Sequence, residues 1–145
     1  MGIWSGNLAK LVTPLPDIMS LPSAEARFVI ALRVAVMSQK SYRDARPYLL
    51  DRLGNERAVN RFLLLVEAIG GVWPEAVMIG RACCPHTMPD EILILSLLRC
   101  AKNDHRPGFD ALICEMIGPC GRDRIYADMI SFSLAYKAST LSKEV

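Results

Sequence analysis

The apolar residues of this chain recur at helical spacing in every long segment. The clearest case is the segment from Glu56 to Ile69, where Val59, Phe62 and Val66 fall on one face of a helix together with Ile69. No segment between turn residues alternates apolar and polar positions, as a half-buried strand would. The sequence therefore predicts an all-α fold, a compact bundle of six or seven helices.

An extended N-terminal arm precedes the helical segments. The length of 145 residues is that of one ordinary domain, and we divide it into an arm (1–22), a single helical domain (23–140) and a polar tail (141–145). Prolines at positions 14, 16 and 22 interrupt the arm. Its apolar side chains would lose burial in a free tail, so we expect the arm to lie on the helical body or on a partner. The candidate partner-binding residues are Leu8, Leu11, Val12, Leu15, Ile18, Met19 and Leu21.

Residues that cap or stop helices place the first three helical segments. Ser23 is an expected N-cap for a helix over 24–38. In the next segment, 42–53, Pro47 either kinks the helix or marks its true first turn. Asn55 is the expected N-cap of the following helix, which Gly70 and the glycine after it would end.

The second half of the chain has weaker boundary signals. We expect a short helix over 73–82, followed by a turn that two prolines enforce. Thr87 and Asp90 have the spacing of a capping box in front of a helix over 91–102. Two further helices are expected at about 107–118 and 122–138.

Composition excludes several classes of protein. Apolar residues make up 52% of the chain and charged residues 22%, which excludes a disordered chain. Net charge is only +2, which argues against a nucleic-acid-binding protein. Mean hydropathy is high at +0.24, so either the core is large or a partner covers apolar surface. We find no secretory signal or membrane-spanning run, and we expect a cytoplasmic protein, with peripheral attachment to a membrane assembly left open.

The five cysteines do not form the pattern of a disulfide framework, because their number is odd and the chain is long enough for its own core. Cys83 and Cys84 lie in the expected turn and are candidate reactive thiols. With His86 they form an alternative metal-binding set, although two adjacent thiols suit one tetrahedral ion poorly. We expect Cys100 and Cys114 to be small buried residues, and we expect no cofactor.

Standard signatures of enzymes are absent from the sequence, including the Walker, dinucleotide-binding and nucleophile-elbow motifs. The first hypothesis is therefore a non-catalytic helical accessory protein that docks on a partner, or on its own copy, through apolar surface and the arm. One alternative is a metal, haem or redox-sensing module at Cys83, Cys84 and His86. The other is a DNA-binding regulator with a helix-turn-helix over 42–69, whose second helix carries Arg57.

The segment from Arg81 to Arg99 has a distinctive order of residues. It begins with a Cys-Cys-Pro turn at positions 83–85, continues through the run from Thr87 to Glu91, and ends in a leucine-rich helix. This order resembles an uncharacterised family of small all-helical proteins from alphaproteobacteria. The resemblance covers about nineteen residues closely and implies a bacterial source. It implies no catalytic residue.

Overall fold

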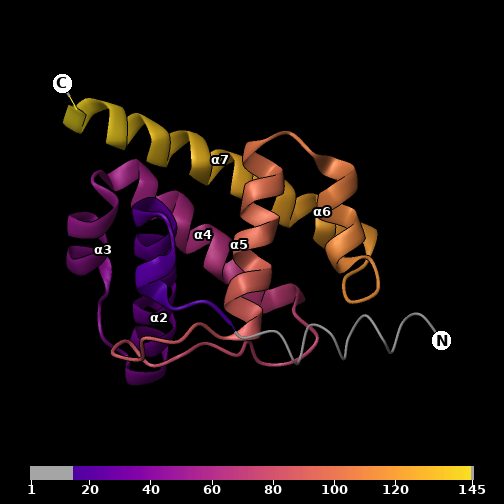
Figure 1. The fold of residues 1–145 in the computed structure, drawn as a ribbon, viewed down its shortest axis with the longest axis horizontal. Helices are drawn as coiled ribbons and strands as arrows, with labels where there is room; N and C mark the ends of the chain where they lie inside the picture. Colours follow the sequence, from indigo (N-terminus) through magenta and orange to yellow (C-terminus); the bar gives the residue numbers. More distant parts are fainter. Residues whose placement is uncertain (1–14, 145) are drawn as a thin grey trace.

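The computed structural model describes residues 15–144, and side chains over residues 15–137. Six α-helices and one short 3-10 helix make up the regular structure of this part of the chain (Figure 1). The arm residues Leu8, Leu11 and Val12 lie outside the described residues. The elements are η1 (Ile18–Ser20), α2 (Ser23–Ser41), α3 (Arg46–Leu53), α4 (Glu56–Val72), α5 (Pro89–Lys102), α6 (Arg106–Ile113) and α7 (Pro119–Glu144).

Two of the expected helix boundaries are confirmed. Pro47 lies in the first turn of α3, where its missing N–H would have no helical partner. The Asn55 side chain accepts a hydrogen bond from the backbone N–H of Ala58 at 2.7 Å and caps α4. Gly54, at a φ of 92°, gives the left-handed turn that ends α3. The strongest local signals in the sequence therefore set the α3–α4 corner.

Several other expectations about boundaries are wrong. Helix α4 continues through Gly70 and Gly71, which were expected to end it, and stops at Val72. Helix α6 ends at Ile113 and not near position 118. Ser23 is the first helical residue of α2, after an N-cap at Pro22 that makes no side-chain cap bond. The Thr87–Asp90 capping box does not form, because α5 begins at Pro89 and Glu91 takes the N3 position. The segment 73–88 contains no helix, although a short one was expected over 73–82. Contacts with distant residues, described below, hold this segment instead.

The core lies between α2, α4, α5 and α7. Helix α4 makes its most extensive contacts with α7, and α5 packs on α7 from another side. Three aromatic rings from three helices meet at the centre: Phe28 of α2, Phe62 of α4 and Phe132 of α7, with every pair of ring centroids 5.6 Å apart. Apolar burial at this junction explains why helices with little intrinsic amphipathicity, such as α2, are stable here.

Candidate functional site

A buried ion pair between two helices is the most organised polar feature of the described chain. Arg33 of α2 and Glu91 of α5 are both fully buried. The Nε atom of Arg33 donates to Oε2 of Glu91 at 2.6 Å, and Nη2 donates to Oε1 at 2.8 Å. These hydrogen bonds raise the pKa of Arg33 above its usual value, so the guanidinium stays charged at any working pH.

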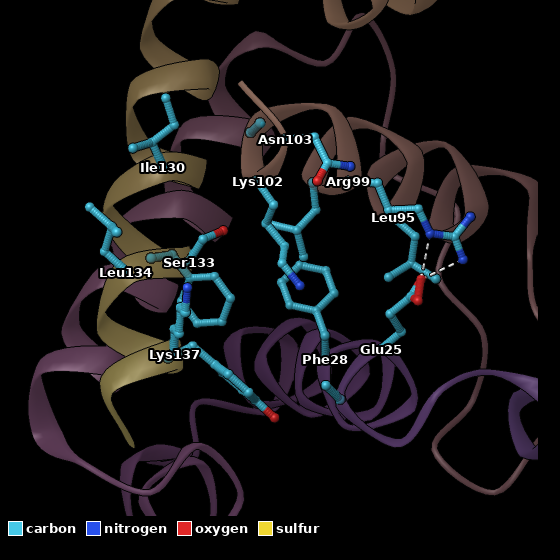
Figure 2. A pocket seen from close by; sticks show the side chains of 15 residues that line it. Glu25, Phe28, Leu95, Arg99, Lys102, Asn103, Ile130, Ser133, Leu134 and Lys137 are labelled. Carbon is cyan, nitrogen blue, oxygen red and sulfur yellow. Dashed lines mark hydrogen bonds and ion pairs between the residues drawn. The ribbon is translucent and has the colours of Figure 1, made fainter. Parts of the chain in front are cut away.

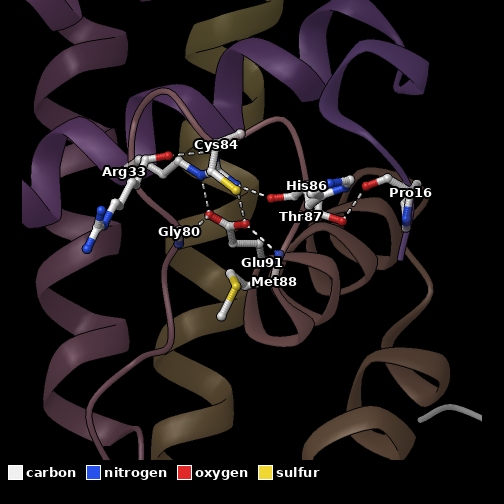
Figure 3. Close-up of polar contacts among 9 residues, drawn as sticks. Pro16, Arg33, Gly80, Cys84, His86, Thr87, Met88 and Glu91 are labelled. Carbon is white, nitrogen blue, oxygen red and sulfur yellow. Dashed lines mark hydrogen bonds and ion pairs between the residues drawn. The ribbon is translucent and has the colours of Figure 1, made fainter. Parts of the chain in front are cut away.

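The same pair fixes the backbone of the segment 73–88 (Figure 3). Arg33 donates its remaining hydrogen bonds to the carbonyl oxygens of Arg81, Cys84 and His86, at 2.7 to 2.9 Å. All five N–H donors of the guanidinium are thereby used. Glu91 in turn accepts from the backbone N–H of Gly80 at 3.2 Å and of Met88 at 2.7 Å.

A glycine is needed at position 80 because there is no room for a side chain, and not because of its backbone dihedral angles. A Cβ atom at position 80 would lie 2.6 Å from Nη2 of Arg33, closer than real Cβ contacts come. The guanidinium itself cannot move away without breaking its hydrogen bonds to Glu91 and to the loop carbonyls. The segment therefore approaches the ion pair as closely as a glycine allows.

The described end of the arm, residues 15–22, is attached to the same segment. The backbone N–H of Ile18 donates to the Pro85 carbonyl at 2.8 Å. The Thr87 hydroxyl donates to the Pro16 carbonyl at 2.6 Å, and the Thr87 backbone N–H donates to the same oxygen at 3.3 Å. We call residues 15–22 the strap. Its backbone runs antiparallel to residues 85–87, with an isolated bridge at position 17.

The strap presents its apolar side chains in two directions. Ile18 is buried in the core, and Leu21 packs against it. Leu15 and Met19 are exposed, with Met19 at 90% of its full exposure. Because η1 is fixed between the loop and α2, the exposed side chains stand on an ordered backbone.

The residues of the alternative metal set differ in exposure and in the contacts they make. Cys83 is exposed and Cys84 is partly buried, with its carbonyl held by Arg33. The Nδ1 atom of His86 lies 2.9 Å from a carboxylate oxygen of Asp17. Within the described residues, no three histidine, cysteine or acidic side chains gather closely enough to hold a metal ion. The set of Cys83, Cys84 and His86 is therefore not part of a three-ligand metal group in this part of the chain.

The other cysteines differ from the sequence expectation. Cys100 is partly buried and packs against the core, whereas Cys114 is exposed at the end of α6. The prediction of burial was wrong for Cys114, which follows the last residue of α6 as its C-cap and is exposed there. All five cysteines are free thiols.

In the segment proposed as an alternative helix-turn-helix, residues 42–69, one of the polar residues is paired within the segment itself. Asn60 accepts a hydrogen bond from Arg46 of α3 at 2.7 Å. Arg57 and Arg61 are exposed on the same helix. Helix α7 covers much of α4, and the side of α4 that faces solvent carries Leu64 as well as these polar residues.

A pocket opens between α2, α5 and α7 (Figure 2). Its volume is about 520 Å³. Phe28, Leu95 and Leu98 form apolar walls, together with Ile130 and Leu134 of α7. Leu134 is 64% exposed, whereas the neighbouring residues Phe132 and Ala135 face the core. The exposed leucine is thus part of the pocket's edge.

The comparisons with known proteins add no family to this geometry. A scan against family models, a search of curated proteins and a search of solved structures each found no match to the chain. Among the described residues, none of the helices combines the length and apolar character that crossing a membrane requires.

Sequence reasoning missed the ion pair that organises the site. Arg33 interrupts the apolar run from Phe28 to Met37, and a charge inside a helix that is apolar on nearly every face must find a partner. Glu91 stands one residue after the acid that we assigned to the cap. Nothing local in the sequence joins the two, because they are 58 residues apart.

Proposed function

We propose that this chain is a non-catalytic helical accessory protein that docks on a protein partner through the strap. The observation that carries the proposal is the contrast within the strap between an ordered backbone and exposed apolar side chains. Ile18 and Thr87 fix the backbone by hydrogen bonds and burial. Met19 nevertheless remains almost fully exposed. Because the backbone beneath Met19 is already fixed, a partner that covers this side chain does not have to order the main chain as well.

The chemistry of the buried groups supports a binding role over a catalytic one. Arg33 uses every N–H donor, and each Glu91 oxygen accepts two hydrogen bonds. A fully paired, solvent-excluded ion pair has no free atom to offer to a substrate. On α6 and α7, Arg106 pairs with Asp110 at 2.9 Å and also with Asp123, and these hydrogen bonds raise its pKa. These charged groups hold elements together.

The experiment is a capture assay on the full chain and two matched variants. Met19→Glu places a charge on the strap, and Met37→Glu places one on an exposed methionine of α2. Captured proteins are identified by mass spectrometry, and the binding of each purified partner is then measured by calorimetry. We expect Met19→Glu to lower the affinity for one stoichiometric partner at least tenfold, which corresponds to about 1.4 kcal/mol. Met37→Glu should leave this affinity unchanged.

Sedimentation of the purified chain distinguishes the two kinds of partner that the proposal includes. A concentration-dependent oligomer that Met19→Glu dissociates would identify the partner as a second copy of the chain. If both variants bound every partner equally well, docking through the strap would be contradicted. The same would follow if no captured protein bound the purified chain in calorimetry.

A further inference from the structure

We propose that the pocket between α2, α5 and α7 binds an aliphatic carboxylate, a single alkyl chain that ends in an anionic head group. This pocket is separate from the strap and does not depend on the function proposed above. Its volume of about 520 Å³ lies within the range of about 300–1,000 Å³ that ligand pockets usually have. Three helices of the core form its walls, so the shape is set by the fold.

The walls of the pocket suit an alkyl chain. Phe28 and Leu95 belong to the buried core, and both line the pocket. Leu134 adds an apolar side chain that is 64% exposed to solvent at its edge. An alkyl chain in the pocket removes its own apolar area and that of Leu134 from water, which is the main source of affinity for such ligands.

The charges around the pocket favour an anion. Arg99, Lys102 and Lys137 line it, and Glu25 is the one carboxylate among the lining residues, which gives a net charge of +2. Glu25 is already engaged, because it accepts a hydrogen bond from Nε of Arg99 at 2.7 Å. Within the described part of the chain, none of the ion pairs includes Lys102. Figure 2 shows Lys102 extending from α5 and Lys137 from α7 beside the pocket.

A buried hydroxyl without a partner marks the α7 wall. Ser133 lines the pocket, and its Oγ atom is shielded from solvent with no hydrogen-bond partner. A buried polar group in this condition costs free energy until a partner reaches it. A change of the Ser133 rotamer would turn this hydroxyl into the pocket, where the oxygens of a carboxylate would accept its hydrogen bond. The polar side of the pocket thus matches the head of the proposed ligand as the apolar side matches its chain.

The size of the pocket favours an alkyl chain over a peptide helix. An α-helix with side chains is about 10–12 Å across and rises 5.4 Å per turn, so a single turn already occupies roughly 500 Å³. The pocket would therefore hold one turn of a helix and no more. A single alkyl chain of about ten carbons is thinner than a helix and fits within this volume with room to spare.

The first test compares the binding of defined probes to the full chain by calorimetry. The probes are octanoate, decanoate, decanol and decyltrimethylammonium, each below its micelle concentration. Decanoate should bind saturably at one site and about fifteenfold tighter than octanoate, because each buried CH₂ contributes about fourfold. Decanol and the ammonium should bind more weakly than decanoate. Absence of saturable binding, or an ammonium that binds as tightly as decanoate, would overturn the proposal.

Variants then locate the site. In Lys102→Gln/Lys137→Gln the affinity for decanoate should fall by about threefold or more, with little change for decanol. Lys40→Gln, at an exposed lysine of α2 outside the pocket, is the matched control. Ala24→Phe places a ring at the pocket from an exposed position in the first turn of α2 and should obstruct the site and weaken binding.

Chemical-shift changes on adding decanoate provide a readout that needs no variant. They should centre on the pocket residues of α2, α5 and α7. Shifts centred elsewhere would refute the site, and so would an unchanged affinity in a folded Ala24→Phe protein.

Discussion

Glu91→Gln is the substitution that most directly tests the role of the buried ion pair. The change keeps the shape of the side chain and removes its charge. A glutamine amide has one oxygen that accepts and one nitrogen that donates. Whichever position the nitrogen takes, it faces an N–H of Arg33 and a backbone N–H, either of Gly80 or of Met88. Two donors then lose their acceptor, and the buried guanidinium loses its counter-charge.

The expected loss of stability is large. Breaking a buried ion pair by removing one partner costs about 3–5 kcal/mol, because the remaining charge is left uncompensated. For a chain of 145 residues, this corresponds to a melting temperature lower by about 10–15 °C. The matched control is Glu67→Gln, on the exposed side of α4, which should change stability by less than about 0.5 kcal/mol.

Denaturation of both variants with guanidinium chloride measures their free energies of unfolding. Amide hydrogen exchange shows which part of the chain is affected. Protection at Gly80 and Met88 should fall further in Glu91→Gln than the global loss alone explains, since Glu91 is the acceptor for both amides. A loss of under about 1 kcal/mol, the value of a surface ion pair, would refute the reasoning. Unchanged protection at the two amides would refute it as well.

Two further predictions concern the backbone around the site. Gly80→Ala should destabilise the protein by about 1–3 kcal/mol in thermal unfolding, because its Cβ would meet the Arg33 guanidinium at 2.6 Å; Gly70→Ala, whose Cβ meets nothing within 4 Å inside α4, should instead stabilise it by about 0.5–1 kcal/mol. Asn55→Ala should cost about 1 kcal/mol in the same assay, because it removes the bond that caps α4, and an unchanged stability would show that solvent caps the helix equally well.

The helical fold could be predicted because its signals are local. Pro47 and Asn55 act within one turn of their own position, and the structure confirms both. The segment 73–88 could not be predicted in this way. Trp73 and the proline after it have the composition of a helix start, but distant residues determine the conformation that follows. Local propensity is decisive only where no stronger tertiary contact competes with it.

The pocket and the ion pair depend on packing that the sequence pattern does not contain. Leu134 has the spacing of a buried residue on α7, and only the position of α2 and α5 decides that it lines an open pocket. Arg33 could have been singled out as a charge in an apolar helix, whereas its partner could not. The arm residues Leu15 and Met19 remain a predicted partner surface, and their exposure is compatible with that role.

Arg33 holds the segment 73–88 by its carbonyl oxygens, and this has a consequence for how the segment tolerates change. A carbonyl belongs to the main chain, so its hydrogen bond is the same whatever side chain the residue carries. Arg81, Cys84 and His86 can therefore be exchanged without removing the contacts that give the loop its shape. At these three positions the loop is a fixed frame with interchangeable side chains, where new surface chemistry can arise, by evolution or by design, without refolding the backbone beneath it; Gly80 and Thr87 do not share this freedom.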